Sequence, residues 1–207
     1  MFFAYAIIAS SSVKTTLENP INIYIPENGF ISINIPLSPM RMGSLSTKTT
    51  HPIYINGLQS ILDALGINAK LIQLYQFKTK GEMLNECLNK ELLKNLIKDS
   101  VSCGKYQRHL THCGTCVPCL VRRSAFYKAG IPDVTSNGYL HEQISNVESR
   151  DISSVAYAYL QYKSSGIKSV TAGHLLFTPS SERSQFENMI ARSLDELGEF
   201  LKYKGVI

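Results

Sequence analysis

The sequence predicts an α/β domain with a parallel sheet, a metal site of four cysteines and a helical extension at the carboxyl end. Three observations support this fold class. Between residues 52 and 96, a helical pattern, a strand pattern and a second helical pattern follow one another, which is the order of an α/β layer. Four of the five cysteines fall within residues 103–119. Two amphipathic patterns of helical period occupy residues 142–165 and 184–203.

Length and composition set wide limits on function. The chain has 207 residues, of which 44% are hydrophobic, enough for one domain with a sizeable core and an appendage. Its 21 basic and 16 acidic residues give a net charge of +5, which permits an anionic small molecule or a nucleic acid as partner but requires neither. Disulfides suit small secreted proteins, and this chain shows no cleavable signal. We therefore expect a cytoplasmic protein without a membrane span.

The first 25 residues predict one helix and one strand. Residues 1–10 are apolar, too few to span a bilayer and preceded by no positive charges, so a buried helix is favoured over a signal peptide. Because this helix would start at the first methionine, we expect that a further segment once preceded it. Residues 21–25 alternate enough for a short buried strand, which Pro26 and the Asn28-Gly29 turn close.

Residues 27–52 lack periodicity and predict a functional loop, because loops of this length inside a domain are rarely filler. Their chemistry suits an anion or a polar heterocycle: a guanidinium can hold a carboxylate or phosphate with two hydrogen bonds, and hydroxyl groups surround Gly43. The candidate substrate-binding residues are Arg41, Ser44, Ser46, Thr47 and Thr50. A solvated loop rich in serine and threonine is the alternative.

The next residues predict a helix and a strand. Residues 52–65 place apolar side chains on one face of a helix, which Gly66 ends. Residues 69–77 then predict a buried strand.

A second helix is predicted from Thr79 to residue 96. Thr79 and Glu82 have the spacing of a capping box, and leucines recur on one face beyond them. Lys80 would lie at the amino terminus of this helix, where it is either solvated or held there for an anionic ligand. Cys87 falls on the apolar face, so we expect it in the core.

The remaining cysteines have the spacing C-x9-C-x2-C-x2-C, and thiolates held this close by short loops favour a tetrahedral site for a soft metal. We interpret it as a structural zinc site bound by Cys103, Cys113, Cys116 and Cys119. An iron–sulfur cluster is the alternative, but a ferredoxin run would next need Cys-Pro where this chain has Arg123 and Ser124. His109 and His112 are spare candidate ligands, expected in the loop or beside the cysteines.

Residues 112–135 read His-Cys-Gly-Thr-Cys-Val-Pro-Cys-Leu-Val-Arg-Arg-Ser-Ala-Phe-Tyr-Lys-Ala-Gly-Ile-Pro-Asp-Val-Thr. This segment resembles the zinc-binding signature of the 7-cyano-7-deazaguanine synthases of queuosine biosynthesis, an HCG-x-C-x-x-C core followed by Leu-x-Arg, Phe and Ala-Gly-Ile-x-Asp-x-Thr. Cys103 matches the first zinc ligand of that family. Thr79-Lys80-Gly81-Glu82 resembles its Thr-Lys-x-Glu segment. Residues 27–52 resemble a divergent branch that includes proteins of bacterial defence operons, with Arg41 at the place of the substrate-loop arginine.

The resemblance covers roughly residues 1–139, with the zinc-binding segment at 103–135, and implies the carboxyl-terminal half of an ATP-dependent ligase. The implied fold is a partial Rossmann-like domain of the adenine-nucleotide-hydrolase type with structural zinc. Such enzymes adenylate 7-carboxy-7-deazaguanine, let ammonia capture the acyl-adenylate as an amide, and adenylate again to form the nitrile. Lys80 would be catalytic by neutralising phosphate charge, while Arg41 and the loop hydroxyls would orient the deazapurine.

One departure from the family is large. Its members carry a Ser-Gly-Gly-x-Asp-Ser loop for pyrophosphate, and this sequence contains no Ser-Gly-Gly. We therefore expect either a fragment or split gene product, or a protein that has lost the ATP step. ATP with Mg²⁺ is expected only if the missing amino-terminal half is supplied.

Residues 140–207 lie beyond the resemblance and predict a helical extension that packs on the main domain or docks a protein partner, which could also supply the amine. The alternative function is a non-catalytic, zinc-stabilised module that contacts nucleic acid or a protein, in antiviral defence. Basic residues surround the metal site: Lys98, Lys105, Arg108, Arg122, Arg123 and Lys128. The cysteine spacing is not that of a zinc ribbon, which argues against nucleic acid. Arg122 is expected to be structural or to contact phosphate.

Overall fold

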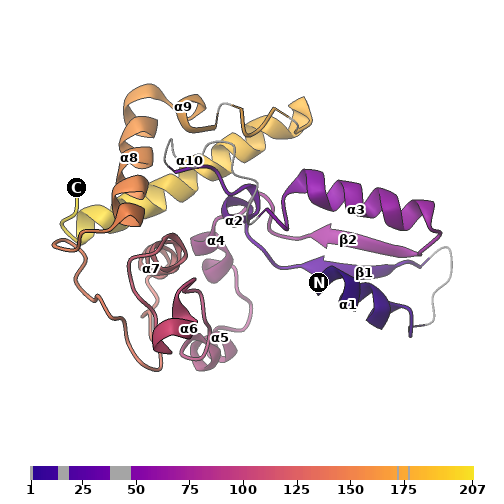
Figure 1. The fold of residues 1–207 in the computed structure, drawn as a ribbon, viewed down its shortest axis with the longest axis horizontal. Helices are drawn as coiled ribbons and strands as arrows, with labels where there is room; N and C mark the ends of the chain where they lie inside the picture. The colour runs from indigo at the N-terminus through magenta and orange to yellow at the C-terminus, as the bar shows by residue number, and fades with distance from the viewer. Residues whose placement is uncertain (1, 14–18, 38–47, 172, 177) are drawn as a thin grey trace.

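The computed structural model describes the chain except for residues 1, 14–18, 38–47, 172 and 177. Two lobes are visible in Figure 1, a small one built on two strands and a larger helical one. The small lobe contains α1 (Phe2–Ser10), β1 (Ile21–Ile25), α3 (Pro52–Ala64) and β2 (Ala69–Gln73). The helical lobe contains α2 (Gly29–Ile33), α4 (Lys80–Asn85), α5 (Lys90–Ile97), α6 (Tyr106–His109), α7 (Val117–Ala129), α8 (Arg150–Ser165), α9 (Lys168–Thr171) and α10 (Ser180–Tyr203).

The expected parallel sheet is present as a pair of strands. β1 and β2 run parallel, with Ile21 opposite Ala69, and α2 and α3 lie in the crossover that such a pair requires. Gln59 of α3 fills the other edge of β2: its amide nitrogen donates to the carbonyl of Ala69, and its amide oxygen accepts from the N–H of Leu71, both at 2.9 Å. The described residues thus form a mixed arrangement of helices and one short parallel sheet. A Rossmann-like domain stays a prediction.

The strand predicted at 69–77 is too long by four residues. β2 ends at Gln73, and residues 74–77 form a turn. This turn allows Phe77 to pack against Phe186 of α10, with ring centroids 4.8 Å apart. Packing on the helical lobe therefore outweighs the strand pattern of this segment.

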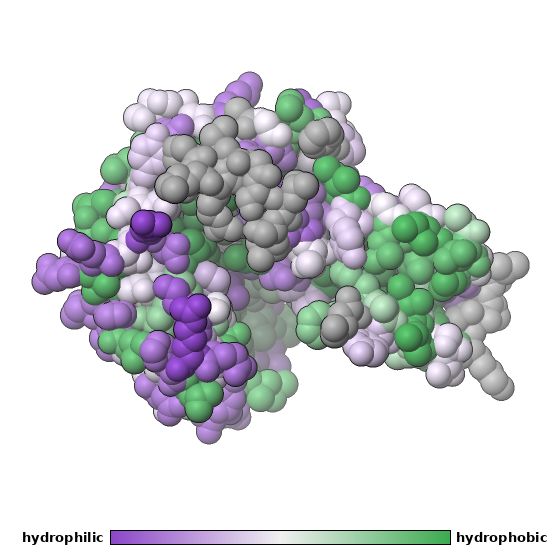
Figure 2. Space-filling model, viewed as in Figure 1, coloured by the Kyte–Doolittle hydropathy of each residue, from purple (hydrophilic) through white to green (hydrophobic). Residues whose placement is uncertain are grey.

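The helix predicted at residues 1–10 is present as α1, but the prediction that it is buried is wrong. Phe2 is 87% and Ile8 65% exposed, and Ser10 is the buried residue of α1. Its apolar side chains lie on all sides, whereas a lobe with two strands can cover only one of them. Figure 2 shows apolar residues gathered over this lobe. No helix among the described residues has the length and apolar composition that a membrane span needs.

Residues 27–52 are not a loop throughout, because α2 forms near their start. The side chain of Asn28 accepts from the N–H of Ile31 at 3.1 Å and so caps this helix. Phe30 and Ile33, three residues apart, are both buried in the main core. A five-residue helix is too short to produce a periodic pattern, so the sequence alone did not predict it.

The single helix predicted from residue 79 to 96 is in fact two helices, α4 and α5. The side chain of Asn89 accepts from the N–H of Leu92 at 2.9 Å and starts α5. Side-chain capping of this kind competes with continuation of the previous helix. Leu88 in the break is fully exposed, and Cys87 is only partly buried, so the prediction of a core cysteine is wrong.

One main core joins α2, α7, α8 and α10. The helix predicted at 184–203 is confirmed as α10, with its expected apolar positions buried: Phe186, Met189, Ile190, Leu194, Leu197 and Leu201. The helix predicted at 142–165 begins only at Arg150, because residues 140–142 are bonded to the cysteine loop and α7 instead. The carboxyl-terminal helices therefore pack directly on α7; the division of the chain at residue 139 stays a prediction.

Candidate metal centre and the surrounding site

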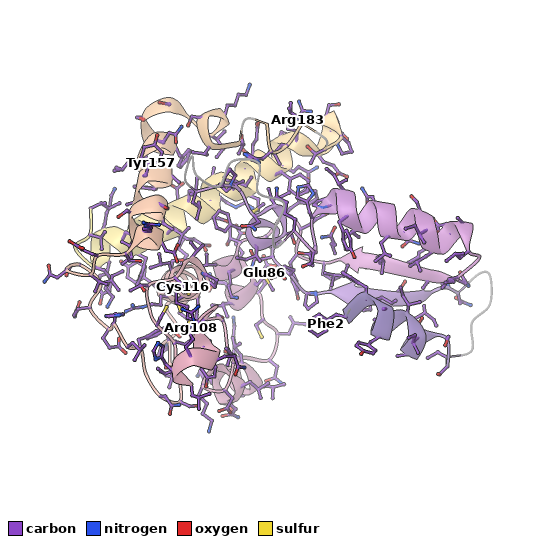
Figure 3. The ribbon with its side chains drawn as sticks, viewed as in Figure 1. Phe2, Glu86, Arg108, Cys116, Tyr157 and Arg183 are labelled. Carbon is purple, nitrogen blue, oxygen red and sulfur yellow. The ribbon has the colours of Figure 1, made fainter. Side chains whose placement is uncertain are left out.

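Four cysteine side chains meet between α6 and α7, where Figure 3 labels Cys116. Cys103, Cys113, Cys116 and Cys119 are all buried, with 0–6% exposure, and their sulfur atoms lie within 4.8 Å of one another. The Cys113–Cys119 and Cys103–Cys116 sulfur pairs are both 3.9 Å apart. Four thiolates placed tetrahedrally about 2.3 Å from one ion would be roughly 3.8 Å apart. The four cysteines are therefore spaced to bind a single metal ion.

Backbone N–H groups point at these sulfurs. Those of Lys105 and Cys113 donate to the sulfur of Cys103, and that of Cys116 donates to the sulfur of Cys113, each at 3.3 Å. Donors of this kind stabilise thiolate over thiol. A hydrogen bond from Cys119 lowers the pKa of Cys116 to about 5, while the same bond raises the pKa of Cys119. Burial raises the pKa of Cys103, so the backbone donors favour the thiolate form while burial of the cluster opposes it.

Neither histidine of the loop points into the cysteine cluster as a ligand. The Nε2 atom of His112 accepts from the N–H of Ser102 at 3.3 Å, and its ring lies between those of Tyr106 and Tyr139. Burial lowers the pKa of His112. His109 is exposed at the end of α6. His112 therefore lies beside the cysteine cluster and is not one of its candidate metal ligands.

Arg122, one turn after Cys119, is a structural residue. It is 1% exposed, and its Nε donates to the carboxylate of Asp133 at 2.8 Å. Its other four N–H groups donate to the carbonyl and hydroxyl of Ser100 and to the carbonyls of Ile97 and Val134. All five guanidinium donors are used, so none is left for a phosphate.

Arg123 joins the loop between Cys113 and Cys116 to residues 141 and 142. Its guanidinium donates to the carbonyls of Gly114, His141 and Glu142 at 2.7–3.2 Å, and it lies over the ring of Tyr139. Gly114 has a φ of +83°, and a Cβ there would be 2.6 Å from the carbonyl oxygen of His141. The glycine of the Cys-Gly-x-Cys sequence is therefore needed for both its conformation and this close approach.

The positive charge expected around the metal site is largely committed to the fold. Arg122 and Arg123 are buried, and Lys128 forms an ion pair with Glu199 of α10 at 3.1 Å. Three of the six basic residues noted in the sequence are thus occupied by contacts within this chain. This weakens the case for a nucleic-acid surface.

Lys80 is the first residue of α4. The predicted capping box is confirmed: the hydroxyl of Thr79 accepts from the N–H of Glu82, and the Glu82 carboxylate accepts from that of Thr79. Burial lowers the pKa of Lys80, the carboxylate of Glu27 opposes this shift, and Arg122 adds to it. Lys80 is therefore a partly buried cation close to both α2 and α7.

Among the candidate substrate-binding residues, Arg41, Ser44, Ser46 and Thr47 lie outside the described residues. The fifth, Thr50, is described: its hydroxyl accepts from Ser32 at 3.1 Å, and its carbonyl accepts from the side chain of Gln73 at 2.6 Å. The structure therefore fixes the end of the predicted substrate loop against α2 and β2.

Two histidines near this loop were missed by the sequence reasoning. His51 is buried and caps α3, its Nδ1 accepting from the N–H of Ile53 at 3.3 Å. Burial, and then the charges of Lys48 and His174, lower the pKa of His51 to about 4. The position of His51 before Pro52 is a helix-start signal. Nothing local to His174 could have placed it near residue 51.

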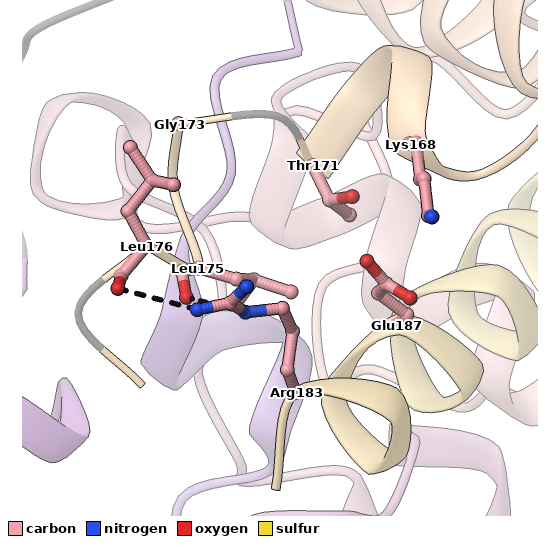
Figure 4. Close-up of a pocket in the computed structure, with 7 residues that line it drawn as sticks. All are labelled: Lys168, Thr171, Gly173, Leu175, Leu176, Arg183 and Glu187. Atoms are coloured by element: carbon pink, nitrogen blue, oxygen red, sulfur yellow. Dashed lines mark hydrogen bonds between the residues drawn. The ribbon is translucent and has the colours of Figure 1, made fainter. Parts of the chain in front are cut away.

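Two cavities lie elsewhere among the described residues. Figure 4 shows one of about 240 Å³ between α9 and α10, where Arg183 donates to the carbonyls of Leu175 and Leu176. A larger one, of about 520 Å³, borders the metal loop at Thr115 and His141 and the start of α8. Neither Lys80 nor Thr50 lines these two cavities.

The chain is similar to the 7-cyano-7-deazaguanine synthase of Methanococcus aeolicus. The two are 36% identical over 92 residues, an alignment that covers 40% of this chain and 37% of that relative. The match thus spans little more than a third of the relative's length. No family model and no solved structure matches the chain. The similarity supports a distant relationship to the deazaguanine synthases.

Proposed function

We propose that this chain forms the metal-stabilised, substrate-side part of an ATP-dependent ligase that acts on 7-carboxy-7-deazaguanine or a related deazapurine acid. The observation that carries the proposal is the cysteine cluster within a segment that resembles the synthase signature. Its four sulfurs fit one tetrahedral ion. Arg122 and Arg123, which follow the last cysteine, donate hydrogen bonds to neighbouring segments of the chain, to Asp133 and to the carbonyl of Glu142.

The proposed metal is zinc, and its role is structural. Four thiolates complete the coordination of Zn²⁺ and leave no open position for substrate or water. All four sulfurs lie within 4.8 Å of one another, which fits ligands of one ion, whereas the cysteines of an iron–sulfur cluster are divided among two or more iron atoms. The ion would hold the loop after α6 against the start of α7, and α7 in turn packs on α4 and α10.

The proposed chemistry transfers AMP from ATP to the substrate carboxylate and releases pyrophosphate. Ammonia or another amine then attacks the acyl carbon, forms the amide and expels AMP. A second adenylation of the amide oxygen, followed by loss of AMP and a proton, gives the nitrile. Lys80 would neutralise phosphate charge, and Arg41 with the hydroxyls of residues 44–50 would orient the deazapurine. The pyrophosphate loop would have to come from outside these 207 residues, which contain no Ser-Gly-Gly.

Metal analysis and calorimetry test the proposal in the purified chain. We expect one zinc ion per chain, lost in a Cys119→Ser variant, and binding of 7-carboxy-7-deazaguanine that is much stronger than binding of guanine. A chain that carries zinc but binds both purines equally weakly would refute the substrate assignment. Iron with acid-labile sulfide in place of zinc would refute the metal assignment.

A further inference from the structure

We propose that Arg192 and Glu196 of α10 are positioning residues for Lys80, which makes the carboxyl-terminal extension a part of the ligase site. The inference rests on the proposed function, because Lys80 needs a defined position only if its ammonium meets the substrate or a phosphate. It concerns residues outside the segments that carry the resemblance to the synthases.

Glu196 accepts hydrogen bonds from the residues on both sides of Lys80, from the side chain of Thr79 and from the backbone of Gly81. It is 6% exposed, and its carboxylate accepts hydrogen bonds from the hydroxyl of Thr79 and from the N–H of Gly81, the latter at 3.3 Å. A buried carboxylate that loses such donors is left with uncompensated charge, so these bonds resist displacement. The residues before and after Lys80 are therefore tied to the same side chain of α10.

Arg192 lies one turn earlier on the same face of α10 and holds the rest of the turn. Its guanidinium donates to both carboxylate oxygens of Glu82, at 2.6 and 3.3 Å, and to the carbonyl of Phe77 at 2.9 Å. Glu82 is also the capping residue of α4. The two side chains of α10 thus contact the chain at four positions within residues 77–82, and Lys80 lies between them.

Gly81 is the sequence feature that permits this contact. In the family pattern Thr-Lys-x-Glu the third position is free, whereas here a Cβ on Gly81 would lie 2.6 Å from Oε1 of Glu196. Any side chain at this position would push the carboxylate away. The glycine is therefore explained by the approach of α10 and not by the conformation of α4.

No hydrogen bond or ion pair from either α10 residue reaches the ammonium of Lys80 among the described residues. The charged groups that act on it are Glu27, before α2, and Arg122 of α7. Glu196 and Arg192 instead bind the Phe77 carbonyl, the Gly81 N–H and the side chains of Thr79 and Glu82, and so hold the turn on both sides of Lys80. This is the arrangement expected of a positioning device, since the cation remains available for an anionic ligand.

Conservative variants of the two α10 residues test the inference in the full chain. Glu196→Gln and Arg192→Lys weaken the hydrogen bonds from α10 to residues 77–82, and Gly81→Ala displaces the carboxylate of Glu196. Glu199→Gln is the matched control, because it breaks a half-exposed ion pair with Lys128 on the same helix. Zinc content and circular dichroism establish that each variant is folded. Two readouts are measured: the affinity for 7-carboxy-7-deazaguanine, and the pH midpoint of Lys80 acetylation, followed by mass spectrometry beside a short lysine-containing peptide as reference.

In the wild-type chain we expect Lys80 to acetylate with a lower pH midpoint than a lysine in a short peptide, because burial lowers its pKa. The Glu196, Arg192 and Gly81 variants should move this midpoint toward that of the peptide and weaken deazapurine binding about tenfold, the value of one charge-assisted hydrogen bond. Glu199→Gln should change neither quantity. If these variants are folded and keep the wild-type midpoint and affinity, the positioning role is wrong even though the proposed function stands. If the midpoint moves but the wild type binds no deazapurine, α10 does fix the turn that carries Lys80, but the proposed function fails and with it the assignment of this turn to a ligase site.

Discussion

Replacing Arg122 with methionine removes the most heavily bonded side chain beside the metal loop. Arg122 is 1% exposed; it pairs with Asp133 at 2.8 Å and donates four further hydrogen bonds. Methionine fills much of the same apolar volume but supplies no donor. The change therefore takes the guanidinium away from the Asp133 carboxylate, which is 15% exposed and also accepts from the hydroxyl of Tyr139.

The expected loss of stability is large because the ion pair is buried. Removing one partner of such a pair costs about 3–5 kcal/mol in the free energy of unfolding. With a urea m-value of about 2 kcal/mol/M, the unfolding midpoint should fall by roughly 2 M.

Urea unfolding of the zinc-loaded chain at pH 7, followed by circular dichroism, measures this midpoint. Arg108→Met is the control, since Arg108 is exposed on α6 and its loss should change the free energy by less than about 0.5 kcal/mol. A loss below about 1 kcal/mol in Arg122→Met would show that the hydrogen bonds of this guanidinium do not hold the helical lobe together.

Metal removal, pH and ATP provide independent tests. Chelation of zinc should abolish hydrogen-exchange protection in residues 103–142, because a structural site contributes on the order of 10 kcal/mol at neutral pH; retained protection would contradict a structural role. Since the pKa of His51 is lowered to about 4, the unfolded chain binds a proton there more readily, so the free energy of unfolding should fall as pH is lowered from about 6.5 toward 4. The His51→Asn variant, which keeps a capping acceptor, should lose less of its free energy of unfolding than the wild type over that pH range. Equal losses in the two proteins would exclude His51 as the cause. Finally, the chain with ATP and Mg²⁺ should release no pyrophosphate, and metal-dependent release would overturn the inference drawn from the absence of Ser-Gly-Gly.

The clustering of the four cysteines could be predicted from the sequence because most of its geometry is local. Cys113, Cys116 and Cys119 lie within seven residues, so short turns and the first turn of α7 suffice to bring their sulfurs together. The role of Arg122 was open between structure and phosphate binding. Only its hydrogen-bond partners, which come from separate segments of the chain, show that no donor remains.

Burial was harder to predict than secondary structure. The apolar pattern of residues 2–10 correctly indicated a helix, but its burial depends on how much of the fold lies beside it. Cys87 failed in the same way, because the local cap at Asn89 ends the helix that would have carried it inward. The pairing of Thr79 with Glu196, 117 residues apart, follows no period and has no local signal except the glycine at position 81.

The capping box shows how far a local motif can define a site. Thr79 and Glu82 start α4, but this helix has six residues and is too short to be stable in isolation. Its capping carboxylate is also the acceptor for Arg192, and its amino-terminal turn binds Glu196. The same helix α10 contributes buried core residues beside α7. Removing α10 would therefore expose the core and, at the same time, release the turn that carries Lys80. We infer that the synthase-like segment and the extension fold as a unit, and that Lys80 has its position only within that unit.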